Sequence, residues 1–188
     1  MDGIRWVSAD QPWFELGYWV FFIRDAGATE VAAHLRSERT FEPGLTRYDA
    51  NDVADDTGQV VVRIGESGGW AYGVVEGGPI GAAREILSSL SVGTSAVQLW
   101  RTVNWDLCME VARNGSSICR FGPDSALWLA NGDVHGFDAA LRGAGWTEGA
   151  DALATERALL VAAELTFALD LPRQDVLEGI LQAALLDG

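Results

Sequence analysis

Strand-like and helix-like hydrophobic patterns succeed one another along the first half of the chain. Residues 17–25, GYWVFFIRD, are dense in aromatic and β-branched side chains, and residues 95–105, SAVQLWRTVNW, have a similar composition. Both segments predict β-strands. Residues 27–38 and 81–93 instead place apolar side chains at helical spacing, and Gly93 is a suitable stop for the second of these helices.

The glycine-rich stretch 63–78, RIGESGGWAYGVVEGG, is best explained as part of a β-hairpin. Strand-like runs flank Gly68-Gly69, which fits a two-residue turn. In that register the Tyr72 ring lies over the bare backbone of Gly65, and Arg63 and Glu76 are diagonal neighbours. One face of the hairpin is then wholly apolar and comprises Val60, Val62, Ile64, Ala71, Gly73 and Val75. A phosphate-binding loop would need a lysine after its second glycine, and the chain contains no lysine.

A second hairpin is predicted around Asn114-Gly115, because both turn residues tolerate the positive φ that a two-residue turn requires. The segment 122–133 is mainly loop, and GFDAALRGAGW, residues 136–146, predicts a short helix. Residues 40–58 lack sustained periodicity and are rich in Gly, Pro, Asp and Asn, so a long surface loop is expected there.

The segment 150–187 predicts two C-terminal helices, broken at Leu171-Pro172. The first helix is apolar nearly all round, so it either threads the core or is shared with a second copy in a homodimer. The second helix has an apolar stripe formed by Val176, Ile180, Leu181, Ala184 and Leu185.

These elements predict a single α+β domain over residues 1–188. We expect a mainly antiparallel sheet of about five or six strands covered by helices, with a C-terminal helical pair. Residues 1–12 are expected to form an N-terminal extension. The predicted element order is β-α-β-β-α-β-β-β, followed by the C-terminal helices.

The net charge of the chain limits the classes of partner that it can bind. The 13 cationic residues are all arginines and face 27 carboxylates, giving a net charge of -14, which would repel nucleic acid. The acidity indicates either solubility or attraction to a basic partner protein. No signal segment or bilayer-length apolar run is evident, so we expect a cytoplasmic protein without membrane association. Cys108 and Cys119 are accordingly expected to be reduced core residues.

The sequence offers little for catalysis or cofactor binding. His34 and His135 lack further ligands at metal-binding spacing, and no G-x-S-x-G motif occurs. The acidic residues Asp49, Asp52, Asp55 and Asp56 miss the EF-hand spacing. No metal or cofactor is therefore expected. Whether the chain is an enzyme stays open, although the absence of a catalytic motif favours a non-enzymatic protein. His135 and Asp138 are the best candidates for an alternative ligand site.

Eight tryptophans are spread along the chain and do not cluster in one element. Most are expected in the core, but exposed ones fit a protein interface, where Trp, Tyr and Arg dominate the binding energy. The candidate partner-binding residues are Asp49, Asp52, Asp55, Asp56, Trp70, Trp105 and Trp128.

Several segments together resemble an uncharacterised family of actinobacterial proteins known only as a domain of unknown function. They are GGWAYGVVEG, LSVGTSAVQLWRTVN, ARNGSSICRFGP, GFDAALRGAGW and ALLVAAELTFALDLPRQDVLEG, and the resemblance runs from about Trp13 to the C-terminus. The chain departs from that family's pattern at Gly122 and Phe167. The resemblance implies an actinobacterial origin and a single-domain architecture, and it transfers no site residues.

The leading functional hypothesis is a non-enzymatic, acidic protein-binding module, similar to bacterial immunity and chaperone-like proteins. The alternative is a small-molecule-binding protein or enzyme with a pocket between the sheet and the helices. A homodimer through the C-terminal helices is compatible with either.

Overall fold

The computed structural model describes residues 2–8, 17–35, 40–76, 83–122, 127–129 and 135–186. The strands are β1 (Tyr18–Arg24), β2 (Thr40–Leu45), β3 (Val60–Ser67), β4 (Trp70–Glu76), β5 (Ser95–Arg101), β6 (Leu107–Arg113), β7 (Ser116–Phe121), β8 (Leu127–Leu129) and β9 (Leu181–Leu186). The helices are the 3-10 helix η1 (Arg5–Val7), α1 (Ala28–His34), α2 (Arg47–Thr57), α3 (Ala83–Leu90), α4 (Phe137–Gly143), α5 (Ala152–Phe167) and α6 (Arg173–Glu178).

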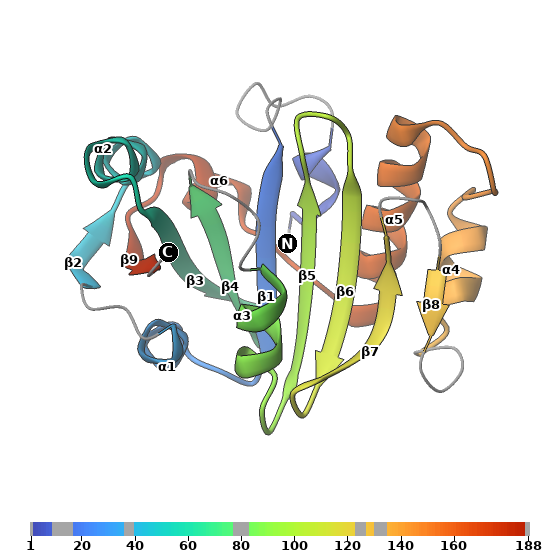
Figure 1. The fold of residues 1–188 in the computed structure, drawn as a ribbon, viewed down its shortest axis with the longest axis horizontal. Coiled ribbons are helices and arrows are strands. Elements are labelled where there is room, and N and C mark those ends of the chain that lie inside the picture. The colour runs from blue at the N-terminus through green and yellow to red at the C-terminus, as the bar shows by residue number, and fades with distance from the viewer. Residues whose placement is uncertain are drawn as a thin grey trace.

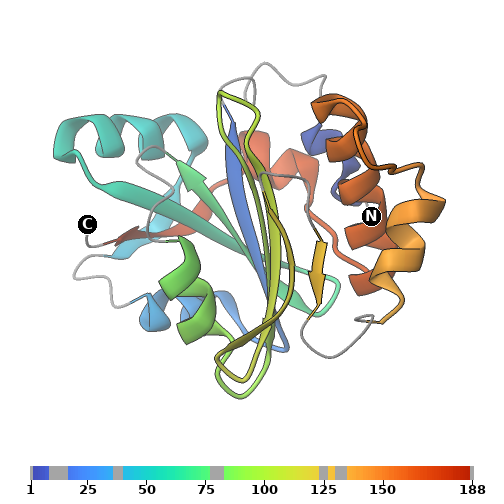
Figure 2. The same cartoon turned by 45° about the vertical axis from the view of Figure 1, so that its right-hand side comes forward.

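All of these strands form one antiparallel sheet with the order β2-β9-β3-β4-β1-β5-β6-β7-β8. Helices α1 and α3 cover one face, whereas α4 and α5 cover the other (Figures 1 and 2). The central strand β1 is buried on both faces: Val20 and Phe22 point toward α5, and Trp19 and Phe21 point toward α1 and α3. The α+β class and the antiparallel sheet predicted from the sequence are therefore confirmed.

Both predicted hairpins are present in the predicted register. Tyr72 pairs with Gly65, where an added Cβ would collide with the tyrosine ring. Arg63 and Glu76 also meet as predicted, with Nη2 2.9 Å from Oε1. At the second turn, Asn114 and Gly115 have φ values of 51° and 79°.

The sheet has nine strands among the described residues, so the expected five or six strands were too few. Each of the three strands that were not predicted lies in a segment for which the sequence predicted a loop or a helix. Strand β2 lies in the expected surface loop, β8 in the expected 122–133 loop, and β9 in the expected second C-terminal helix. Within the 122–133 loop, residues 123–126 and 130–133 lie outside the described residues.

The surface loop predicted over residues 40–58 is wrong, because β2 and α2 occupy most of it. Helix α2 begins with a capping box: the Thr46 hydroxyl accepts a hydrogen bond from Asp49 N, and the Asp49 carboxylate accepts one from Thr46 N. The helix buries only Ala50 and Ala54. Such a narrow apolar face gives a weak periodic signal, which explains the missed helix.

The second C-terminal helix is shorter than the sequence predicted. It ends at Glu178, and residues 181–186 form β9 between β2 and β3. An inner strand buried on both faces presents a continuous apolar run, which periodicity alone does not separate from a buried helix. Among the described residues, no helix has both the length and the apolar composition to cross a membrane.

The predicted N-terminal extension is wrong for residues 2–8, which pack into the structure; residues 1 and 9–12 lie outside the described residues. Ile4 and Val7 are buried in the main core. The Gly3 amide donates to Asp170 Oδ1 at 2.8 Å, and the Trp6 indole donates to the Leu171 carbonyl at 2.8 Å.

Candidate functional site

A pocket of about 100 Å³ opens at the lower end of the sheet in Figure 1, against the C-terminal end of α5. The ends of β1 and β6 meet there with the starts of β4 and β5. The described residues that line it are Arg24, Trp70, Ser95, Val97, Val111, Arg113, His135, Thr166 and Phe167. We call this cavity the arginine pocket.

Arg113 is fixed in the arginine pocket by two hydrogen bonds. It is the last residue of β6 and pairs in register with Ser95, whose Oγ accepts from Arg113 Nε at 3.1 Å. Arg113 Nη2 lies 2.8 Å from His135 Nε2. A guanidinium only donates hydrogen bonds, so Nε2 is the acceptor and the proton of the neutral ring sits on Nδ1.

Arg24 brings a second guanidinium to the arginine pocket from the end of β1. Its Cζ lies 5.7 Å from the centroid of the Trp70 ring, which supports it as a cation–π partner. Arg24 Nε is 3.8 Å from Asp25 Oδ2, but both side chains are mostly exposed. An exposed pair at that distance gives little net stabilisation, so Asp25 neutralises Arg24 only weakly.

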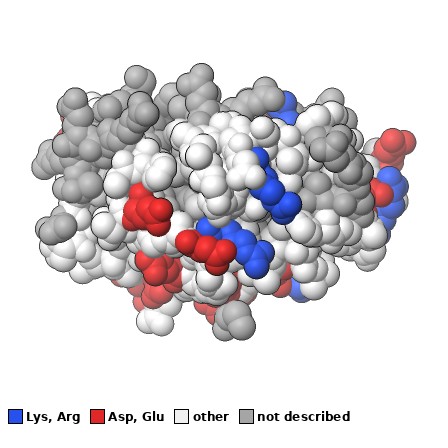
Figure 3. Space-filling view, turned by 90° about the horizontal axis from the view of Figure 1, so that it is seen from below, with Lys and Arg blue, Asp and Glu red and all other residues white. Residues whose placement is uncertain are grey.

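No Asp or Glu is among the described residues that line the arginine pocket, although the chain carries 27 carboxylates and 13 arginines. Thr166 Oγ1 is buried and has no hydrogen-bond partner within the described structure. The end of the molecule that carries the pocket shows arginines beside acidic side chains on a mostly uncharged surface (Figure 3). The lining itself is positively charged and offers spare hydrogen-bond donors.

His135 lines a pocket between the sheet and α5, but neither Asp138 nor the acidic residues of α2, which the alternative hypothesis placed beside it, are in the described lining. The Asp138 carboxylate accepts from Arg142 Nε at 3.1 and 3.2 Å and is absent from the described lining. His135 instead contacts Arg113 and lies edge-on to Phe167, with the ring centroids 6.3 Å apart. The sequence did not indicate Arg24 or Arg113, because strand pairing between distant segments brings them together.

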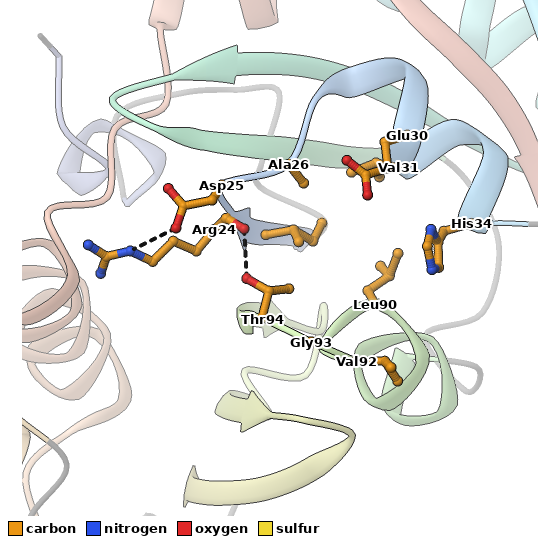
Figure 4. A pocket seen from close by; sticks show the side chains of 11 residues that line it. Arg24, Asp25, Ala26, Glu30, Val31, His34, Leu90, Val92, Gly93 and Thr94 are labelled. Atoms are coloured by element: carbon orange, nitrogen blue, oxygen red, sulfur yellow. Dashed lines mark hydrogen bonds and ion pairs between the residues drawn. The ribbon is translucent and has the colours of Figure 1, made fainter.

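A second pocket, of about 220 Å³, lies between α1 and α3 on the opposite face of the sheet. In Figure 4, Glu30 and His34 extend from α1, while the Arg24 side chain leads away toward Asp25. The described residues contain no group of three or more His, Cys, Asp or Glu side chains that could hold a metal ion. The lining of this pocket mixes acidic, basic and apolar side chains, so its charge selects no class of ligand.

The opposite end of the sheet carries the predicted acidic residues and Trp105. Asp49, Asp52, Asp55 and Asp56 are all exposed on α2. The turn 102–106 joins β5 to β6 at the same end (Figure 1). Trp105 in this turn is 42% exposed and has a φ of 65°, and Val103 is 58% exposed.

The 102–106 turn rests on a buried ion pair. Arg101 Nε lies 2.8 Å from Glu156 Oε1, and both side chains are almost fully buried. The Arg101 guanidinium lies over two rings, with its Cζ 4.4 Å from the Trp105 centroid and 5.5 Å from that of Tyr18. Burial raises the pKa of Tyr18 well above its ordinary value, and the Glu156 carboxylate raises it further.

The other two predicted tryptophans lie elsewhere. Trp70 is only 4% exposed and lines the arginine pocket, so its prediction as an exposed partner-binding residue was wrong. Trp128 is 51% exposed on the edge strand β8, on the far side of the sheet from α2 (Figure 1). The structure thus brings Trp105 and the four aspartates to one end of the sheet and separates Trp70 and Trp128 from them.

Comparison with known proteins gives one result. The sequence model of a family of unknown function, DUF6461, matches residues 2–171. The chain belongs to the DUF6461 family. No curated protein and no solved structure matches it.

The DUF6461 match begins before Trp13, where the resemblance was expected to start, and it includes the packed N-terminal segment. It contains every described residue of the arginine pocket, all of α2 and the 102–106 turn. Helix α6 and strand β9 follow the matched region. DUF6461 has no established activity, so functional conclusions rest on the geometry of this chain.

Proposed function

We propose that the chain is a non-enzymatic protein-binding module, comparable to bacterial immunity and chaperone-like proteins, and that it binds a basic partner. The contact surface is the end of the sheet that carries the 102–106 turn and α2. The observation that supports this most strongly is the conformation of Trp105.

Trp105 combines exposure with a fixed, costly backbone conformation. A bulky residue in the left-handed region costs about 1–3 kcal/mol and persists only where the surroundings impose it. Here the Trp105 amide donates to the Thr102 carbonyl at 3.0 Å, and the Thr102 amide donates to the Asp106 carbonyl at 2.9 Å. A rigid, exposed tryptophan loses little entropy on binding and is a frequent hot spot in protein interfaces.

The exposed aspartates of α2 favour a positively charged partner. Asp49, Asp52, Asp55 and Asp56 are exposed on α2, which lies at the same end of the sheet as the turn between β5 and β6 (Figure 1). Such a surface repels acidic proteins and accelerates association with basic ones, and the effect weakens as salt screens it. A basic partner protein is therefore favoured over nucleic acid.

Neither of the two pockets formed by described residues has the size usual for a receptor of a large ligand. The two pockets described above measure about 100 and 220 Å³. Sites for drug-sized ligands usually measure about 300–1,000 Å³.

The test is affinity capture from lysate of an actinobacterial host, the source implied by the family resemblance, with bound proteins identified by mass spectrometry. We expect one stoichiometric, basic partner that is retained at low salt and weakened at moderate salt. The variants Trp105→Gly, which suits the left-handed backbone, and Val103→Ser should lose it, whereas Trp128→Ala, a matched exposed tryptophan, should retain it. Capture that is absent, or equal for all variants, would overturn the proposal.

A homodimer through the C-terminal helices stays a separate proposal. Much of α5 is buried against the sheet, but Leu165 on α5 is 65% exposed and Ile180 after α6 is 61% exposed. Sedimentation at increasing protein concentration tests it, with Leu165→Ser as the variant that should remain monomeric. A monomer at all concentrations would exclude this dimer.

A further inference from the structure

We propose that the arginine pocket binds a phosphate group, either as free inorganic phosphate or at the end of a small phosphorylated metabolite. This site lies at the opposite end of the sheet from the proposed protein-binding surface (Figure 1) and is independent of it.

The charge of the pocket selects an anion. Arg24 and Arg113 both line it, and the lining contains no carboxylate within the described residues. In a chain with a net charge of -14, such a local surplus of positive charge is unusual. Arginine recognises phosphate through paired N–H donors, and it stays charged at any physiological pH.

The donors are arranged before a ligand arrives. Ser95 and His135 hold Arg113 through its Nε and one Nη2 proton, which leaves both Nη1 protons and the second Nη2 proton for an anion. Arg24 lies over Trp70 and approaches from a different strand. Thr166 adds a buried hydroxyl without a partner in the described part of the chain.

The number and directions of these donors favour phosphate over a carboxylate. A carboxylate presents two oxygens in one plane, whereas phosphate presents oxygens in several directions and carries up to two negative charges. A cavity of about 100 Å³ accommodates a group of that size but not a nucleotide. A nucleotide or other large phosphate ester would have to leave its remaining atoms outside the pocket.

The two arginines have another structural explanation, because cations near a helix C-terminus complement its dipole and α5 ends at Phe167. The two explanations differ in what they predict. Dipole complementarity alone requires no anion, so added phosphate would change neither the stability nor the spectra of the protein. A phosphate site requires saturable binding that depends on both guanidinium groups.

The experiment is titration of the full chain with inorganic phosphate at low, constant ionic strength, followed by calorimetry and by chemical-shift changes in the arginine side chains. We expect saturable one-to-one binding, at least tenfold weaker in Arg24→Gln and Arg113→Gln. Arg142→Gln removes the same charge from an exposed helix outside the described lining and should bind like the unaltered protein. Unfolding curves without phosphate verify that each variant is folded.

Two further probes separate the ligand sources. Glycerol 3-phosphate binding more tightly than inorganic phosphate would assign the site to a phosphorylated metabolite, and the reverse order to free phosphate. Acetate at the same concentration should bind at least tenfold more weakly than inorganic phosphate. Non-saturable binding, acetate binding of equal strength, or unchanged binding in Arg113→Gln would overturn the proposal.

Discussion

Arg63 and Glu76 form an ion pair in the interior of the molecule, across the β3–β4 hairpin. Arg63 Nη2 lies 2.9 Å from Glu76 Oε1 and also donates to the Val176 carbonyl at 2.6 Å, and the Arg63 side chain is fully buried. Burial lowers the pKa of Arg63 from its ordinary value, and the Glu76 carboxylate opposes that shift. The pair joins the hairpin to the segment that leads into β9.

Replacing Glu76 by Gln should destabilise the protein strongly. The substitution leaves the Arg63 charge buried without its carboxylate, which lowers the free energy of unfolding by about 3–5 kcal/mol. Denaturant titration followed by circular dichroism measures the change. Asp138→Asn breaks an exposed pair with Arg142 and should cost less than about 1 kcal/mol. Equal losses of unfolding free energy in the two variants would show that the buried ion pair stabilises the protein no more than the exposed one.

The close approach of Tyr72 to Gly65 gives a second prediction. In Gly65→Ala, the new Cβ would collide with the Tyr72 ring, so we expect a loss of about 1–3 kcal/mol of stability. Gly143→Ala is the matched control, because nothing lies within 4 Å of its added Cβ and alanine favours the helix. A Gly65→Ala protein as stable as the Gly143→Ala protein would contradict the packing described here.

Tyr72 should also make stability depend on alkaline pH. Burial raises the pKa of Tyr72 to about 12, and the negative charge of Asp175 adds to the shift. Because the unfolded phenol ionises near pH 10, this contribution is fully present below pH 10 and is lost as the pH rises toward 12.

Between pH 9 and pH 11.5 the loss assigned to Tyr72 should reach about 2 kcal/mol relative to Tyr72→Phe, which lacks the ionisable group. Unfolding curves at pH 9 and pH 11.5 measure the difference. Identical pH profiles for the two proteins would refute the assignment.

The left-handed backbone of Trp105 can be tested without a partner protein. Trp105→Gly and Trp105→Ala both lose the stacking of the indole on Arg101, but only glycine adopts a φ of 65° without steric cost. We therefore expect the glycine variant to be more stable than the alanine variant by about 1 kcal/mol. The opposite order, measured by thermal unfolding, would mean that the turn relaxes once the ring is gone.

Removal of residues 179–188 should prevent correct folding. Without β9, strands β2 and β3 lose the neighbour that both pair with, and unpaired strand edges promote aggregation. We expect the shortened chain to be largely insoluble on expression. A soluble, monomeric product with an unchanged circular dichroism spectrum would show that β9 is dispensable.

Local signals in the sequence were sufficient for the six strands β1 and β3–β7. The turns Asn114-Gly115 and Gly68-Gly69 set the registers of their hairpins. The register of the Gly68-Gly69 hairpin places Tyr72 against Gly65 and Arg63 against Glu76. Neighbours in the chain make these contacts, so turn chemistry alone determines them.

The same local signals could not predict which strands pair when they lie far apart in the chain. Strand β9 pairs with β2 and β3, which lie more than 100 residues earlier, and its apolar run suits a helix equally well. The arginine pocket likewise joins Arg24, Arg113 and Thr166 from three distant segments. Single-sequence patterns contain no information about which distant segments meet, so the sequence indicated His135 but not the arginines around it.

The position of β9 also constrains the order in which the molecule can assemble during synthesis. Strands β3, β4, β1, β5, β6 and β7 are adjacent in the sheet and leave the ribosome before residue 122, so this block can pair early. Strand β2 is made before β3, yet its described pairing is with β9 alone. It must therefore wait for about 140 further residues of translation before its hydrogen bonds can form. During that interval the open edge of β3 is the part of the nascent chain most in need of protection.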